Sequence, residues 1–212
     1  MHQDVQTSFM RMLLADVVRA DAAHRADPGQ GAKRDFVRTS FAAIEGAVWS
    51  FREHIRALAI STEELSDAER AVLSEIAYSV DKTGRLSPQA KFLTLPAAIR
   101  LCARIGQRIA PAANMDFAGA GWQNFTLAID IRNRITHPKS LDDLNLTDGD
   151  LNTCAAALHW FLEESTHMMQ ATLSAARDHV EGIREVLNDL KSGDEEAWRV
   201  YRSLITGNDD PV

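Results

Sequence analysis

A short segment of the chain places an arginine, an asparagine and a histidine close together. The segment runs from Ile131 to Lys139 and contains Arg132, Asn133 and His137. Arginine is a permanent cation whose planar guanidinium can grip a phosphate, and histidine is the side chain best suited to move protons near neutral pH. Together they offer a base for a ribose 2′-hydroxyl and a cation for the charge that develops on a phosphate. Those two groups suffice to cut RNA without a metal.

The order Arg-Asn-x-x-x-His resembles the signature of the HEPN superfamily, in which a histidine follows an Arg-Asn pair at a short interval. The resemblance implies an all-helical domain, commonly dimeric, and often a metal-independent endoribonuclease of a toxin or defence system. It gives His137 the role of general base or acid and Arg132 that of stabilising the phosphorane. Asn133 would orient the imidazole or bind a phosphate oxygen, while Arg134 and Lys139 would guide the RNA backbone.

A carboxylate on another helix is a further candidate for this site. HEPN-like domains often carry a polar or acidic residue on the helix that faces the motif, and Glu45 is the candidate for that position here. It would orient Arg132 or His137. The alternative is that Glu45 is only a solvated carboxylate at the edge of an apolar seam.

The spacing within the motif favours two chains at one site. Arg132 and His137 are five residues apart, so on a regular helix their side chains point about 140° away from each other. Either the helix unwinds at His137, where Pro138 disfavours helical geometry, or two chains meet about a twofold axis. A homodimer is therefore expected. The bland alternative is that Arg132 pairs with an acidic neighbour such as Asp130, while His137 only closes the helix C-terminus, where a cation is favourable.

The composition is that of an ordinary globular protein and sets limits on function. The chain has 212 residues, of which 45% are hydrophobic and 25% charged, with a formal net charge of −7. That charge argues against broad, nonspecific binding of nucleic acid, which depends on neutralising phosphates. Two cysteines make no disulfide framework and fit a reducing cytoplasm. No apolar run is long enough to span a bilayer, and no signal peptide is expected.

Helical periodicity dominates the chain and predicts an all-α fold, an antiparallel bundle of four to six main helices with a long C-terminal helix. The expected helices span residues 4–25, 33–60, 68–80, 96–110, 122–136 and 150–191, with a loop over 81–88. In the second of these, apolar residues recur in steps of four and three: Val37, Phe41, Ile44, Val48, Phe51, Ile55 and Leu58. The same spacing in the last helix picks out Ala155, Leu162 and Met169 among its seam residues. A single HEPN-like domain is expected over residues 1–192, with its core at about 35–179. Residues 193–212 would be a C-terminal extension with a short helix and an acidic tail.

No metal or cofactor site is expected. His159, Glu163 and His167 share one helical face, but a carboxylate-bridged metal bundle needs a second Glu-x-x-His motif, which the sequence lacks. The tryptophans lie on separate elements without an interleaved basic stripe, which favours packing over a platform for stacked bases.

Two functional hypotheses follow. In the first, the chain is a dimeric, metal-independent endoribonuclease of a toxin or defence type, with RNA as substrate and an antitoxin or defence-system protein as a possible partner. In the second, the same helical dimer binds RNA, a nucleotide or a protein without turnover.

Overall fold

The computed structural model describes residues 2–62 and 64–205, and it is helical in nearly all of its regular structure. The chain divides into two compact units, Met1–Thr172 and Leu173–Val212, so the first unit ends 20 residues before the expected domain end at residue 192. The elements are α1 (His2–Ala26), α2 (Gln30–Ser61), α3 (Asp67–Leu73), β1 (Ile76–Val80), β2 (Leu86–Ala90), α4 (Leu95–Ile109), α5 (Ala120–Thr136), the 3-10 turn η1 (Asp142–Leu144), α6 (Asp148–Ser192) and α7 (Glu195–Ile205). The predicted all-α bundle with a long C-terminal helix is confirmed. Within the described residues, no helix has the length and apolar character needed to cross a membrane.

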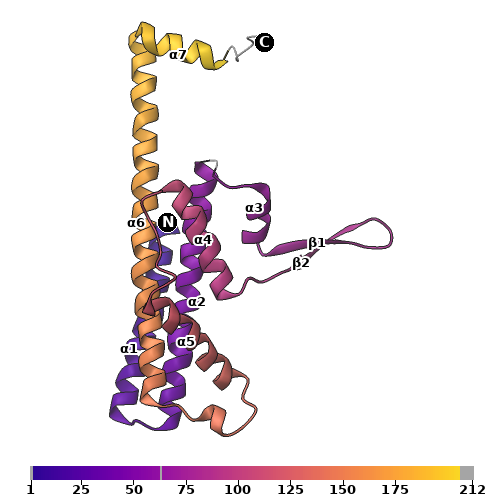
Figure 1. Cartoon of the computed structure of the whole chain (residues 1–212), viewed down its shortest axis with the longest axis vertical. Coiled ribbons are helices and arrows are strands. Elements are labelled where there is room, and N and C mark those ends of the chain that lie inside the picture. Colours follow the sequence, from indigo (N-terminus) through magenta and orange to yellow (C-terminus); the bar gives the residue numbers. More distant parts are fainter. Residues whose placement is uncertain (1, 63, 206–212) are drawn as a thin grey trace. The chain divides into compact units, whose positions relative to one another are not determined.

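Helix α2 is the central element of the first unit, and it packs against α1, α4 and α5 (Figure 1). Six of the seven residues of its predicted seam are buried, and Leu58 is half-buried. Phe51 of this seam meets Phe161 of α6 edge to face, with 6.1 Å between ring centroids. The alternation of steps of four and three therefore predicted the buried face of α2 correctly, as close antiparallel packing requires.

The buried face of α6 differs from the expected one. Cys154, Phe161 and Met168 are buried, whereas Ala155, Leu162 and Met169, which the sequence pattern selected, are exposed or half-buried. At every second position of the seam, the predicted residue directly follows the one that is buried. Both residues of each such pair are apolar, so periodicity alone does not choose between them.

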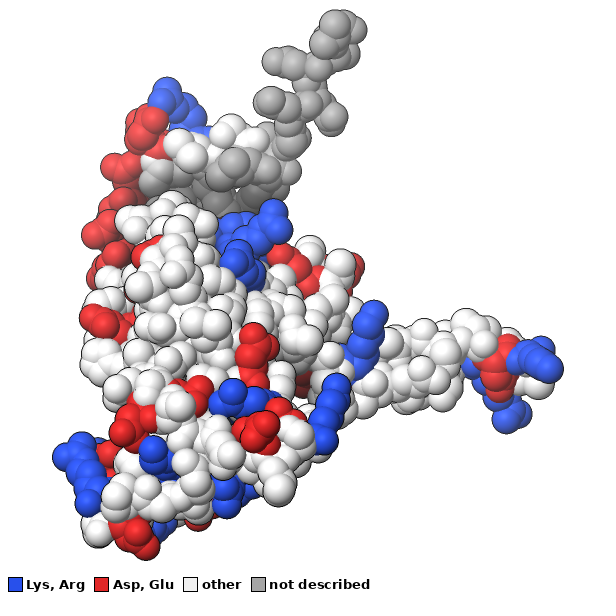
Figure 2. Space-filling model, turned by 60° about the horizontal axis from the view of Figure 1, so that its bottom comes forward, with Lys and Arg blue, Asp and Glu red and all other residues white. Residues whose placement is uncertain are grey.

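A β-hairpin replaces part of a predicted helix, and its omission is the main error of the sequence prediction. The capping box formed by Ser66 and Glu69 opens α3 as predicted, but the helix ends at Leu73, and residues 76–80 pair antiparallel with residues 86–90. The backbone of Glu75 is left-handed, with φ of 52°, a conformation that a helix cannot continue through. Figure 2 shows the charged side chains of the hairpin gathered at its tip.

The base of the hairpin is fixed to the bundle through α3. Arg108 of α4 donates hydrogen bonds to both carboxylate oxygens of Glu69, each at 2.8 Å. These bonds lower the pKa of Glu69 from 4.5 to about 2. The carboxylate is therefore ionised at neutral pH and holds α3 against α4.

The second unit contains the end of α6 and all of α7. Gly193 turns the chain with φ of 80°, and Asp194 caps α7 by accepting a 2.8 Å hydrogen bond from the backbone of Ala197. Trp198 then donates its indole N–H to the carbonyl of Leu190, at 3.0 Å. The predicted short helix of the extension is thus present, whereas the predicted acidic tail lies outside the described residues.

Gly121 sets how closely α5 approaches α6, so replacing it provides a test of the packing. A Cβ atom at Gly121 would lie 2.0 Å from Cδ1 of Trp160, and an indole held among Trp122, Phe125 and Phe161 has little room to move. We expect Gly121→Ala to lower the free energy of unfolding by about 1–3 kcal/mol, the usual cost of overpacking a core. Urea denaturation followed by circular dichroism measures this change.

Gly31→Ala is the matched control, because Gly31 also lies in the first turn of a helix but has no atom within 4 Å of an added Cβ. This variant should be neutral or stabilising by up to about 1 kcal/mol. Equal effects of the two substitutions would contradict the close contact between α5 and α6.

Candidate functional site

The motif occupies the C-terminal end of α5, and the helix ends where the sequence predicted. The backbone N–H of His137 still donates to the carbonyl of Asn133 at 2.9 Å, but His137 itself has φ of −126° and ψ of 57°, outside helical values. Pro138 follows and removes the next backbone donor. His137 is therefore the first residue beyond the helix, and its side chain is exposed to solvent.

Arg132 is held against α2 by Glu45. Its Nη2 donates to Glu45 Oε1, and its Nη1 donates to the side-chain oxygen of Asn133 at 3.1 Å. The guanidinium carbon also lies 5.7 Å from the ring centroid of Phe41, one helical turn before Glu45. The structure thus brings together three of the four residues expected in the catalytic site.

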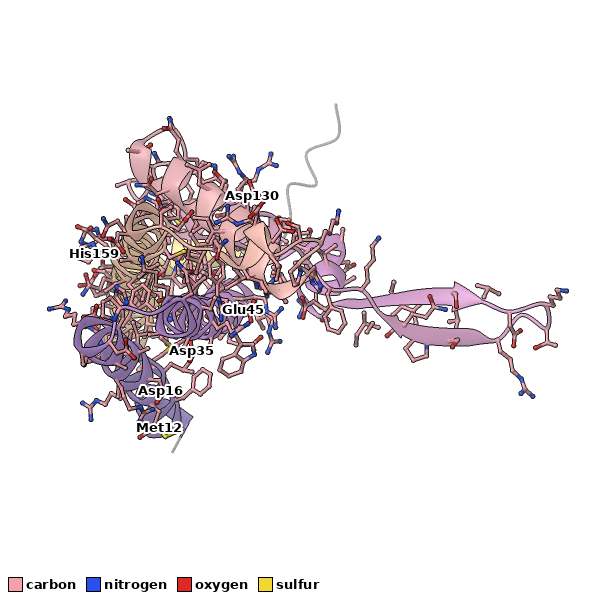
Figure 3. The ribbon with its side chains drawn as sticks, turned by 90° about the horizontal axis from the view of Figure 1, so that it is seen from below. Met12, Asp16, Asp35, Glu45, Asp130 and His159 are labelled. Atoms are coloured by element: carbon pink, nitrogen blue, oxygen red, sulfur yellow. The ribbon has the colours of Figure 1, made fainter. Side chains whose placement is uncertain are left out.

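Asp130, the alternative partner for Arg132, lies elsewhere. Glu45 and Asp130 occupy separate positions when the side chains are viewed from below (Figure 3). Asp130 lines a different surface depression, together with Arg134 and Asp150. Arg132 therefore forms its ion pair with Glu45 of α2 and not with Asp130 of its own helix.

A groove with a volume of about 670 Å³ opens beside this ion pair, and we call it the Arg132 groove. Among its lining residues are Glu45, Trp49, Arg52, Glu75, Phe92 and Arg132. Glu45, Trp49 and Arg52 follow one another in steps of four and three on α2. Of these three residues, Glu45 and Trp49 are exposed and Arg52 is half-buried. Sequence reasoning selected Glu45 but missed Trp49 and Arg52, although the same helical spacing from Glu45 could have found both.

A second ion pair lies in the groove. Arg52 Nη1 is 2.8 Å from Glu75 Oε2, and the backbone N–H of Leu93 donates to Glu75 Oε1 at 3.1 Å. Burial opposes ionisation of Glu75, but the Leu93 hydrogen bond and Arg52 outweigh it, so the pKa of Glu75 is lowered. The groove thus holds two arginines, and each is paired with a carboxylate.

His137 faces a neighbouring depression rather than the Arg132 groove. This His137 depression measures about 490 Å³ and is lined by Asn133, Arg134, His137, Lys139 and Asp143. Of the residues that line the Arg132 groove, Asn133 is the one that also lines the His137 depression. In a single chain, the structure therefore does not bring Arg132 and His137 to one cavity, even though the helix ends before His137.

The two residues expected to guide RNA differ in their surroundings. Arg134 Nη2 lies 3.3 Å from Asp150 Oδ1 of α6, so its charge is partly compensated. The backbone N–H of Lys139 donates to Asp143 Oδ2 at 2.8 Å. This bond, with that from Ser140, lowers the pKa of Asp143. The loop after His137 is thereby fixed, while the side chain of Lys139 is exposed.

Metal ligands and cysteine thiols are the other groups that could form a reactive centre. Among the described residues, no group of three or more His, Cys, Asp or Glu is arranged to hold a metal ion. On the exposed side of α6, His159 Nδ1 lies 3.8 Å from Glu163 Oε2. Burial raises the pKa of the Cys102 and Cys154 thiols to about 12. Neither thiol is therefore a nucleophile at neutral pH.

Comparisons with known proteins find no match to this chain among protein-family models, curated proteins or solved structures.

The Arg132–Glu45 pair should contribute little to stability, because both side chains are partly exposed, 32% and 44% respectively. Exposed ion pairs typically contribute about 0.2–1 kcal/mol. We expect Arg132→Ala and Glu45→Ala each to lower the free energy of unfolding by less than about 1 kcal/mol, with a coupling energy in the same range. A double-mutant cycle by urea denaturation measures this coupling. A coupling of several kcal/mol would make the pair a structural element of the bundle.

Proposed function

We propose that this protein is a HEPN-like, metal-independent endoribonuclease of a toxin or defence type, which cuts RNA by attack of the ribose 2′-hydroxyl. The observation that carries the proposal is the arrangement at the end of α5. Arg132 is oriented by Glu45 and Asn133 in an open groove, and the exposed His137 follows directly after the end of α5. An arginine oriented before the ligand arrives needs little reorganisation to stabilise developing charge.

The proposed roles follow from these positions. His137 removes the proton from the 2′-hydroxyl or donates one to the leaving oxygen, because its imidazole is exposed and forms no hydrogen bond within the described residues. Arg132 binds the phosphate and stabilises the phosphorane. Asn133 presents its side-chain oxygen to Arg132, so its role is to orient that arginine. Lys139 guides the RNA backbone, while the contact of Arg134 with Asp150 makes Arg134 mainly an anchor between α5 and α6.

The separation of Arg132 and His137 supports a dimeric site. Their side chains line different depressions that share Asn133, and acid–base catalysis requires the histidine within hydrogen-bond reach of the reacting oxygen. Two chains that meet with their α5 ends near a twofold axis would form one cleft with two Arg132 and two His137 side chains. We therefore propose a homodimer. The free thiols of Cys102 and Cys154 support a cytoplasmic location.

The first test of this function combines motif variants with analysis of the RNA ends. We expect His137→Ala and Arg132→Ala each to reduce cleavage about 10²- to 10⁴-fold, because each removes a group that acts in the transition state. Cleavage by the wild-type protein should persist in EDTA, leave DNA intact and give 2′,3′-cyclic phosphate and 5′-hydroxyl ends.

Lys82→Ala is a suitable control, since this exposed residue at the hairpin tip lies far along the chain from the motif. It should cleave as well as the wild-type protein. A strict need for Mg²⁺, 5′-phosphate products, or full activity of either motif variant would contradict the mechanism.

The second test concerns assembly. If the site is shared, light scattering at micromolar concentration should report twice the 23.5 kDa mass of one chain. Mixing His137→Ala and Arg132→Ala chains should then restore part of the cleavage activity, because a mixed dimer can keep one intact pair across the interface. A monomeric protein that still cleaves RNA would contradict the shared cleft.

The second candidate function is a non-catalytic module that binds RNA, a nucleotide or a protein such as an antitoxin. Two observations favour it: the formal net charge of −7, and the engagement of both Arg132 and Arg134 by carboxylates. Binding of RNA without cleavage over a range of substrates would decide for this candidate.

A further inference from the structure

Phe92 is the most exposed aromatic side chain that the structure describes, at 80%. It follows strand β2 and lines the Arg132 groove. Leaving such a ring in water forgoes the stabilisation that its burial would provide. A ring that is exposed at the edge of a groove is accessible to a ligand and would gain stability if the ligand covered it.

The backbone on both sides of Phe92 is held by Glu75. The N–H of Lys91 donates to the Glu75 carbonyl at 2.8 Å, and the N–H of Leu93 donates to the Glu75 carboxylate at 3.1 Å. Arg52 fixes the same carboxylate from α2. Phe92 therefore projects from a fixed backbone segment, which lowers the cost of ordering the chain when a ligand binds.

The left-handed backbone of Glu75 adds to this argument. A non-glycine residue with φ of 52° is in a sparsely populated conformation. Such conformations persist where the surroundings enforce them, and they cluster at functional sites. Here the three contacts of Glu75 both enforce that conformation and define the position of Phe92.

The remaining walls of the groove suit a flat, uncharged group with polar edges. Trp49 is 43% exposed and lines the groove together with Phe92. The carboxylates of Glu45 and Glu75 balance the charges of Arg132 and Arg52. Because these charges are balanced, the groove would not attract a run of phosphates. Arg132 can still exchange its partly exposed partner Glu45 for a single phosphate. A nucleobase, in contrast, can stack on an aromatic ring whatever its identity.

We propose that the Arg132 groove is a nucleobase-binding subsite, in which an unpaired RNA base stacks on Phe92 while Arg132 contacts an adjacent phosphate. The proposal rests on the proposed function in taking RNA as the ligand, and it adds the part of the RNA that is recognised. It selects single-stranded over double-stranded RNA, because bases within a duplex are not free to stack on a protein ring.

Binding to a short single-stranded RNA that carries 2′-fluoro groups tests the proposal without requiring cleavage. Fluorescence anisotropy gives the Kd for the full-length protein. Phe92→Ala should raise the Kd about 5- to 100-fold, the effect of losing one stacked base. Phe92→Trp keeps an aromatic surface and should bind like the wild-type protein.

Tyr78→Ala is the matched control. Tyr78 is also an exposed aromatic side chain, at 65%, but it lies on strand β1 and does not line the groove. Its loss should leave the Kd unchanged. Equal weakening by Tyr78→Ala and Phe92→Ala would overturn the subsite, as would tighter binding of a duplex than of the single strand.

The result distinguishes this inference from the proposed catalysis. Binding that depends on Phe92, in a protein that never cleaves natural RNA, supports the subsite and refutes only the ribonuclease function. Cleavage with binding that is indifferent to Phe92 overturns the subsite and keeps the ribonuclease. Absence of any binding to single-stranded RNA overturns the subsite outright.

Discussion

The burial of α2 is the constraint on which the rest of the first unit depends. This helix packs against several neighbours, and its apolar residues in steps of four and three fill the contacts. A helix covered on most sides keeps one narrow exposed strip, and residues in the strip must repeat with the same spacing. Glu45 and Trp49 are exposed in that strip, and the half-buried Arg52 continues it. The groove wall is therefore a consequence of the packing, because shifting the seam by one residue would bury these side chains.

The sequence predicts an element well when local apolar spacing determines it, and poorly when pairing with a distant segment does. The helices follow local apolar spacing, and α2 and α5 have nearly the predicted bounds. The segment over residues 68–80 failed because Ile76, Tyr78 and Val80 also alternate with period two, which is the strand pattern. They lie opposite Ala90, Pro88 and Leu86 of β2, which are exposed and do not form a core. Only the pairing itself, together with the left-handed Glu75, decides against the helix.

The same distinction applies to the residues of the candidate site. Arg132, Asn133 and His137 are neighbours in sequence, so a motif names them, and the helical spacing of α2 leads from Glu45 to the other strip residues. Glu75 and Phe92 lie on either side of the hairpin in the sequence. They both line the groove only because the hairpin brings the chain back to α2. The hydrogen bonds that Glu75 accepts from Lys91 and Leu93 span up to 18 residues, and no local pattern predicts such a contact. The residues of the proposed chemistry can therefore be found from the sequence. Those of the proposed base recognition cannot, because they depend on a hairpin that the local pattern did not predict.

The pairing of Arg132 with Glu45 has a further consequence for binding. A partly exposed ion pair contributes only about 0.2–1 kcal/mol, whereas a charge-assisted hydrogen bond to a phosphate is roughly twice as strong as a neutral one and can be bidentate. In the proposed function, Glu45 would direct the guanidinium toward the groove without holding it so tightly that an incoming phosphate cannot compete. A buried carboxylate in the same place would bind the arginine too well, and an alanine would leave it unoriented. The partial exposure of the pair is therefore what would make the proposed role of Glu45 possible.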